Sequence, residues 1–129
     1  MITIGARYIS FDDFIDIVFN SGRVELSHEA ILEVEENFNF LKSFSKNRTI
    51  YGINTGFGPM ARYKIADEDV EQLQLNLIRS HAAGTGKILP DIYARGAVLA
   101  RLNSLMLAKS GVHPDVVHLL AEFLNNNIS

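Results

Sequence analysis

The chain is organised around one stretch, Tyr51-Gly52-Ile53-Asn54-Thr55-Gly56-Phe57-Gly58. Its three glycines allow left-handed or crowded backbone, so the stretch is predicted to be a loop that can approach a ligand closely. Tyr51 adds a phenol that can donate a hydrogen bond, accept one or lose its proton. Asn54 and Thr55 add short polar groups that fix turns. The stretch therefore predicts a functional loop rather than a helix or a strand.

Helical patterns precede this loop. Residues 2–9 alternate loosely and are expected to form a short strand or an extended arm. Ser10 is predicted to cap a helix over 11–19, with Asp13 three residues on and a stop at residues 20–22. Ser27 is predicted to cap a second helix. Phe40 and Phe44 are expected to widen the apolar stripe of this helix.

Three more helices are predicted after the loop. The first covers 67–83, starts at Asp67, and is expected to bury a stripe formed by Val70, Leu73, Leu77 and Ile78. The second starts at residue 90 or 91 and is expected to stop at Gly111. The third starts at His113-Pro114 and stops at the asparagines 125–127. The fold class is therefore mainly α, with at most a short strand pair near the N-terminus.

Composition excludes several classes of protein. The 129 residues carry a net charge of -3, and the 12 basic residues are scattered, which argues against a nucleic-acid partner. The chain has no cysteine, so a disulfide framework and a thiolate metal site are both excluded. The sequence shows neither a signal peptide nor a long apolar run, so we expect a cytoplasmic protein without a membrane partner.

Two alternative kinds of site fail on spacing. Gly84-Thr85-Gly86-Lys87 resembles part of a phosphate loop, but His81 and Ile88 stand where that motif needs a glycine and a serine or threonine. His113 and His118 are five residues apart, so they do not share one face of a helix, and no metal site is expected.

The octet at 51–58 resembles the active-site loop of the aromatic amino acid ammonia-lyases, a family that includes histidine, tyrosine and phenylalanine ammonia-lyases and related aminomutases. Two further stretches resemble the same family in the same order. The first is Asn76-Leu77-Ile78-Arg79-Ser80-His81-Ala82-Ala83-Gly84-Thr85-Gly86, and the second is Ala100-Arg101-Leu102-Asn103-Ser104-Leu105 followed by Ser110-Gly111-Val112. The resemblance thus runs along the last two thirds of the chain.

The resemblance implies roles for individual residues. Tyr51 would be the catalytic base, acting as a phenolate, and the rest of the loop would hold it: Gly52, Asn54, Thr55, Gly56, Phe57 and Gly58. Asn76 would line the pocket. His81 would bind the imidazole or phenol of an aromatic amino acid, because family members that take histidine or tyrosine carry histidine at this position. Without the resemblance, His81 would be interpreted as hydrogen-bonded to a backbone carbonyl. For Tyr51, the residues alone leave a half-buried aromatic residue and a functional phenol equally open.

The chain departs from the family in one respect. Family members form a methylidene-imidazolone electrophile from their own Ala-Ser-Gly triplet, and residues 1–129 contain no such triplet. We therefore expect the chain to be the N-terminal segment of a longer lyase, with a part near 1–90 that carries the loop and the start of a helical bundle near 91–129. The triplet is expected beyond Ser129, and the isolated segment is expected to be inactive.

Three functions stay open at this stage. The first is elimination of ammonia from histidine or tyrosine, giving urocanate or coumarate. The second is an aminomutase of the same family, and the third is a non-catalytic helical interaction module descended from such an enzyme. Because the family assembles as homotetramers, residues 91–129 are expected to expose apolar stripes, and the segment is expected to self-associate.

Overall fold

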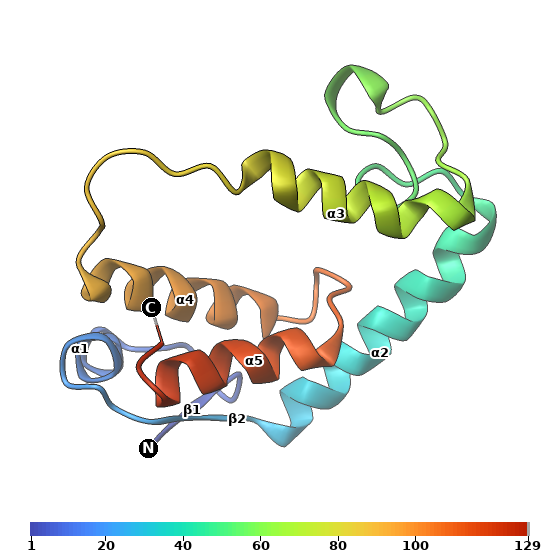
Figure 1. Ribbon diagram of the computed structural model, residues 1–129. Coiled ribbons are helices and arrows are strands. Elements are labelled where there is room, and N and C mark those ends of the chain that lie inside the picture. Colours follow the sequence, from blue (N-terminus) through green and yellow to red (C-terminus); the bar gives the residue numbers. More distant parts are fainter. Residues whose placement is uncertain (129) are drawn as a thin grey trace. The chain divides into compact units, whose positions relative to one another are not determined.

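The computed structural model describes residues 1–128, and the side chains of Asn47, Met60 and Asp67 lie outside that description. The chain divides into two compact units, one built from residues 1–41 and 88–129 and the other from residues 42–87. The predicted mainly helical class, with at most a short strand pair near the N-terminus, is confirmed (Figure 1).

The first unit begins with a small β-α-β arrangement. Strand β1 (Ile2–Ile4) pairs in parallel with β2 (Val24–Leu26), in the register Ile2 to Val24. Parallel strands need a crossover, and helix α1 (Phe11–Phe19) supplies it here. Strand β2 is missing from the sequence prediction, because three residues give too short an alternating pattern to recognise.

The predicted cap of α1 is confirmed in full. The Ser10 hydroxyl accepts a hydrogen bond from the Asp13 backbone N–H at 3.1 Å, and the Asp13 carboxylate accepts one from the Ser10 backbone N–H at 2.9 Å. Arg7 donates to both oxygens of the same carboxylate, at 2.6 and 3.0 Å. The Arg7 and Ser10 hydrogen bonds hold the pKa of Asp13 well below its usual range.

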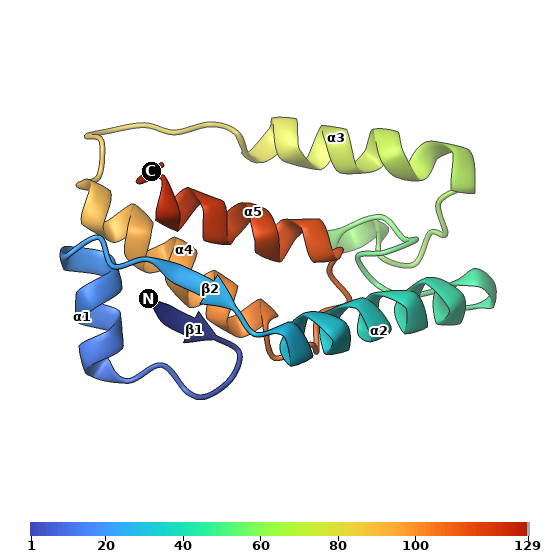
Figure 2. The ribbon, with the colours of Figure 1, turned by 90° about the horizontal axis from the view of Figure 1, so that it is seen from below.

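Helices α2 (His28–Phe44), α4 (Asp91–Leu105) and α5 (Pro114–Asn125) complete this unit, α2 continuing three residues into the second unit. Figures 1 and 2 show α4 and α5 lying side by side and running in opposite directions, with α1 against α4 and β2 against α5. The buried side chains meet in one core: Ile4, Ile17, Val18, Val24, Ala30, Leu99, Leu102, Leu105, Met106, Val117, Ala121 and Leu124.

Two expectations about these helices are wrong. Helix α4 ends at Leu105 rather than near Gly111, because Ala108 adopts a left-handed φ of 54° and the chain turns back toward α2, where the Gly111 N–H donates to the Asn37 side chain at 2.7 Å. Phe40 and Phe44 do not join a buried stripe, since 58% of Phe40 and 37% of Phe44 are exposed. The expected cap of α2 by Ser27 and the start of α5 at Pro114 are both confirmed.

The second unit carries the loop. It contains three short 3₁₀ turns, η1 (Ser45–Asn47), η2 (Gly58–Met60) and η3 (Asp67–Asp69), and helix α3 (Val70–His81). The stripe predicted to be buried on α3 is not buried, and Ile78 is 64% exposed. Helix α3 continues directly from η3, and the 64–66 segment borders a hollow with α3 rather than burying its face. Among the described residues, no helix is both long and apolar enough to cross a membrane.

Candidate active site

The predicted catalytic residue Tyr51 sits in a tight turn. The Ile53 N–H donates to the Ile50 carbonyl at 3.2 Å, which makes Tyr51 and Gly52 the two central residues of the turn. Gly52 has a φ of +79°, a value that a turn of this kind reserves for glycine at its third position. The turn leaves Tyr51 64% exposed, so the phenol is accessible from solvent.

Two buried polar side chains follow the turn. Asn54 is 8% exposed and Thr55 is 1% exposed. The Asn54 carboxamide oxygen accepts from the Ile50 N–H at 2.8 Å, and the Thr55 hydroxyl accepts from the Gly52 N–H at 3.3 Å. Buried polar groups cost free energy unless they are hydrogen-bonded, and here both residues use their side chains to close the turn that carries Tyr51.

The remainder of the loop pairs with the segment before η3. Thr55 and Lys64 form an isolated antiparallel bridge, and the Gly56 N–H donates to the Tyr63 carbonyl at 3.1 Å. Phe57 returns toward the turn, and its ring meets the Tyr51 ring edge-on with centroids 6.2 Å apart. Gly58 has a φ of +55° where η2 begins. The predicted loop residues thus form one connected structure.

Asn76 lines a hollow of about 350 Å³ between α3 and the 64–66 segment. Its amide oxygen accepts from the Gln72 side chain, one helical turn earlier, at 2.8 Å. Lys64 and Asp69 contribute a charge of each sign to the same hollow. Sequence reasoning missed Lys64 and Gln72, although the four-residue spacing of Gln72 and Asn76 was a usable signal for a shared helix face.

His81 is the last residue of α3 and lies exposed at its end. Its Nδ1 lies 2.9 Å from the Leu77 carbonyl oxygen, which is the alternative that sequence reasoning had weighed against a substrate-binding role. The Ser80 hydroxyl lies 3.0 Å from the same nitrogen. In the tautomer in which Nδ1 donates to the carbonyl oxygen, which only accepts, Nε2 of the neutral ring is left as an acceptor.

All three predicted chemical residues belong to the second unit, and each has its own bonding partners. Within residues 1–128, no hydrogen bond or ring contact joins Tyr51, Asn76 and His81 to one another. The second unit therefore holds Tyr51 in its turn and carries Asn76 and His81 separately on α3.

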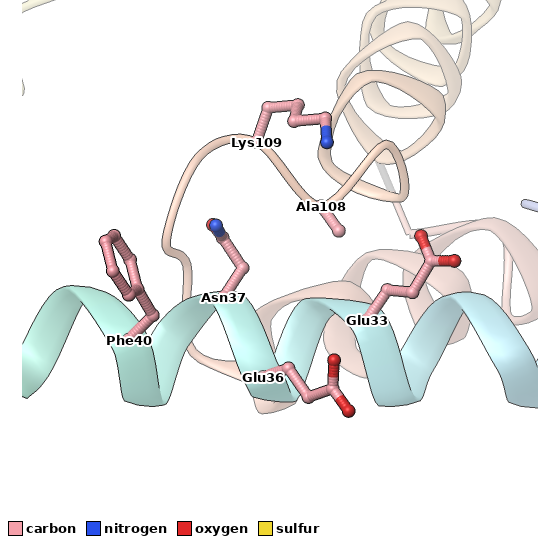
Figure 3. A pocket seen from close by; sticks show the side chains of 6 residues that line it. All are labelled: Glu33, Glu36, Asn37, Phe40, Ala108 and Lys109. Carbon is pink, nitrogen blue, oxygen red and sulfur yellow. The ribbon is translucent and has the colours of Figure 1, made fainter.

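A hollow in the first unit has a different character (Figure 3). It is about 490 Å³ in volume and lies between α2 and the segment after α4, lined by Glu33, Glu36, Asn37, Phe40, Ala108 and Lys109. It contains none of the predicted site residues. Nor do the described parts of the chain bring together three histidine, aspartate or glutamate residues in a way that could hold a metal ion.

Comparison with known proteins agrees with the resemblance seen in the sequence. Residues 9–129 match the family described as aromatic amino acid lyase. The chain belongs to this family.

Individual members of the aromatic amino acid lyase family match almost the whole chain. A probable histidine ammonia-lyase of Thermoplasma acidophilum is 36% identical over 129 residues, and the histidine ammonia-lyase of Shouchella clausii is 37% identical over 129 residues. Each alignment covers 99% of this chain and 26% of the relative. The chain thus spans about a quarter of the length of these relatives.

Solved structures of the family share the fold. The tyrosine aminomutase from Streptomyces globisporus is 29% identical, with a TM-score of 0.90 over 99% of this chain and 24% of its own. The phenylalanine aminomutase of Pantoea agglomerans is 29% identical, with a TM-score of 0.87 over 98% of this chain and 25% of its own. Both lyases and aminomutases are therefore represented among the proteins this chain is similar to.

Proposed function

We propose that this chain is the N-terminal portion of an ammonia-lyase acting on histidine or tyrosine, in which Tyr51 is the catalytic base. The observation that carries the proposal is the Tyr51 turn, an exposed phenol on a closed backbone turn, in a chain of the aromatic amino acid lyase family. The similarity to histidine ammonia-lyases at 36 and 37% identity supports the choice of substrate class.

The base has a defined task in such a reaction. Elimination of ammonia removes a proton from the carbon next to the aromatic ring, a weakly acidic position, and expels a poor leaving group. The described side chains and backbone offer the Tyr51 hydroxyl no hydrogen-bond partner, and Tyr51 is 64% exposed, so its oxygen is accessible to that proton. The backbone turn supplies the fixed position that efficient proton transfer needs.

The electrophile of the family is not formed by these residues. A methylidene-imidazolone arises from an Ala-Ser-Gly triplet and, when present, activates the substrate toward loss of its amine. Residues 1–129 contain no Ala-Ser-Gly, so the contribution proposed for this chain is confined to the base and to substrate binding. The 129 residues alone are accordingly expected to release neither urocanate nor coumarate.

His81 is proposed to select the substrate. With Nδ1 donating to the Leu77 carbonyl, Nε2 of the neutral ring accepts a hydrogen bond from an imidazole N–H or a phenol O–H. Phenylalanine offers neither group, and a site built around such a bond rejects the analogue that lacks it. Asn76, in its hollow on the same helix, is proposed as a second binding residue.

An aminomutase is the second candidate. The similarity to tyrosine and phenylalanine aminomutases, with TM-scores of 0.90 and 0.87, favours it. An aminomutase would use the same tyrosine and return the amine to the neighbouring carbon. The two activities differ in product, an olefinic acid or a β-amino acid, so one assay separates them.

The test is a hybrid enzyme in which this chain replaces the matching quarter of the Shouchella clausii histidine ammonia-lyase. We expect ultraviolet-absorbing olefinic acid from histidine or tyrosine and little from phenylalanine. His81→Leu should reduce activity on the preferred substrate more than on phenylalanine, whereas the control His28→Leu should leave the preference unchanged. A folded hybrid that forms neither an olefinic acid nor a β-amino acid would contradict the proposal.

A further inference from the structure

Asn54 makes more connections than any local turn requires. Its carboxamide nitrogen donates to two carbonyl oxygens, of Arg48 at 2.7 Å and of Ser45 at 3.2 Å. Its carboxamide oxygen accepts from the Ile50 N–H at 2.8 Å. Its backbone carbonyl accepts from the Ile65 N–H at 3.0 Å. A side chain that is 8% exposed thus uses both ends of its amide.

These bonds join three separate pieces of the second unit. Ser45 and Arg48 belong to the segment that follows α2, and Ile50 opens the turn of Tyr51. Ile65 belongs to the segment that lines the hollow of Asn76. Asn54 therefore connects the turn of the proposed base to the segment that lines the hollow of Asn76.

Shape and charge explain why an asparagine is needed. The site presents one N–H donor and two carbonyl acceptors to the same planar group, and a neutral amide supplies one acceptor and two donors. A carboxylate of the same shape would keep the bond from Ile50 but would face two carbonyl oxygens without a proton to offer. Asn54→Asp thus removes two N–H donors and adds one negative charge, while the side-chain volume stays nearly constant.

We infer that Asn54 is a positioning residue. Its carboxamide fixes the backbone of residue 54 to the segment 45–50, and the bond of its backbone carbonyl to Ile65 then keeps the Tyr51 turn in place relative to residues 63–65, beside the hollow of Asn76. The inference rests on the proposed function, because it acts through Tyr51 as the base. The hydrogen bonds of Thr55 to Gly52 and Gly56 close the loop itself, whereas those of Asn54 anchor it to its surroundings.

The test is a double-substitution cycle in the hybrid enzyme. Asn54→Asp should lower kcat about 100-fold, the scale expected for a displacement near 1 Å of a reacting group, while KM changes little. In the Tyr51→Phe background the same substitution should cause no further fall in kcat, because its effect passes through the phenol. The control Asn39→Asp makes the same chemical change on an exposed position of α2 and should leave kcat unchanged.

The outcomes separate the two claims. If Tyr51→Phe abolishes the activity of the hybrid but Asn54→Asp leaves kcat unchanged, the positioning role of Asn54 is wrong, while the role of Tyr51 as the base still holds. If the two substitutions reduce kcat independently, the positioning role is also wrong. If Tyr51→Phe has no effect, the proposed function itself fails.

A second measurement does not depend on activity. In the 129-residue chain, Asn54→Ala should accelerate amide hydrogen exchange both at Ile50, which loses its side-chain acceptor, and at Ile65, whose acceptor is only the backbone of residue 54. Amides of α5, in the other unit, should exchange at an unchanged rate. Acceleration at Ile50 alone would show that the carboxamide does not anchor the loop to the 63–65 segment and would overturn the inference.

Discussion

Gly52 is the residue on which the placement of Tyr51 depends. The sequence could identify Tyr51 and its glycines, because their types and spacing are visible in the chain. It could not show that the buried Asn54 side chain would bond to residues 45, 48 and 50, since those bonds depend on how the segment after α2 folds back. The sequence was also ambiguous about His81, whose contact with the Leu77 carbonyl is a matter of local geometry.

Gly52→Ala should destabilise the second unit by about 1–2 kcal/mol, because an alanine pays that penalty in left-handed backbone and Gly52 has a φ of +79°. A Cβ there would meet nothing closer than Phe57 at 3.9 Å, so the cost is conformational rather than steric. Denaturant unfolding measures it. Gly84→Ala is the control, since a Cβ there meets no atom within 4 Å and the φ of Gly84 lies outside the left-handed region. An equal loss of stability in both variants would contradict a conformational cost specific to Gly52.

Among the helices, the starts of α1 and α5 could be predicted from nearby residues, whereas the burial of α3 could not. The Ser10 and Asp13 cap of α1 and the His113-Pro114 start of α5 lie within a few residues of chain and were predicted from it. The burial of α3 was predicted wrongly, because an apolar stripe states what a helix can pack against and not whether a partner is present in the same unit. The end of α4 was also misplaced, since Asn37 of α2, distant in sequence, holds the turn that follows.

The cap of α1 makes a prediction about pH. The pKa of Asp13 is lowered in the folded chain, chiefly by its hydrogen bonds to Arg7 and then to Ser10. A carboxylate whose pKa is lowered on folding stabilises the folded chain. This stabilisation is complete above the pKa of an unfolded aspartate, about 3.9, and it is lost as the pH falls toward the lower pKa of the folded chain. Asp13→Asn should therefore lower the melting temperature at pH 7, and the gap to the unsubstituted chain should narrow below about pH 4.

The matched control for this helix is Asp12→Asn, which removes a carboxylate from the same first turn. It lacks the contacts of Asp13 with Arg7 and Ser10 among the described side chains. Melting curves between acid and neutral pH compare the two. A gap for Asp13→Asn that stays constant across that range would show that the carboxylate does not stabilise the cap.

At the scale of the whole chain, one buried charge ties the first unit together. Arg95 of α4 is 6% exposed and donates to the Ile17 carbonyl of α1 at 2.7 Å and to the Leu124 carbonyl of α5 at 3.0 Å. It also donates to the Asn127 side chain at 2.6 Å. Both carbonyls lie near helix C-termini, where a positive charge is favoured. No sequence pattern identifies such an arginine, because its partners come from two distant segments, α1 and the end of α5.

Arg95→Ala should lower the free energy of unfolding by on the order of 3 kcal/mol, since the charged hydrogen bonds to the Ile17 and Leu124 carbonyls are lost, and of these two carbonyls Leu124 alone keeps a backbone N–H donor among the described residues, from Asn127 at 3.4 Å. Arg95→Lys should restore only part of this, because one ammonium cannot reach the separate acceptors that a guanidinium spans. The exposed Arg101→Ala on the same helix is the control. Equal urea midpoints for Arg95→Ala and Arg101→Ala would contradict the stabilising role of the Arg95 hydrogen bonds.

The exposed apolar side chains predict self-association of the 129-residue chain. Ile88 is 96% exposed, Phe11 76% and Leu89 68%. Single apolar side chains are ordinary on a protein surface, but a large number of exposed apolar side chains favours contacts between molecules. Sedimentation should show dimers or larger species, and a dye that reports apolar surface should bind. A monomer that binds no such dye would count against this prediction and against the homo-oligomer proposed from the family.

The most direct measurement is kcat of the hybrid enzyme on histidine or tyrosine with and without Tyr51→Phe. A general base accounts for about 10²–10⁴ in rate, so we predict a fall of at least about 100-fold in a hybrid that still folds. Tyr63→Phe removes a phenol of similar exposure from the same unit, 61% against 64%, and should leave kcat unchanged. Equal kcat for Tyr51→Phe and Tyr63→Phe would contradict the claim that this chain supplies the catalytic base.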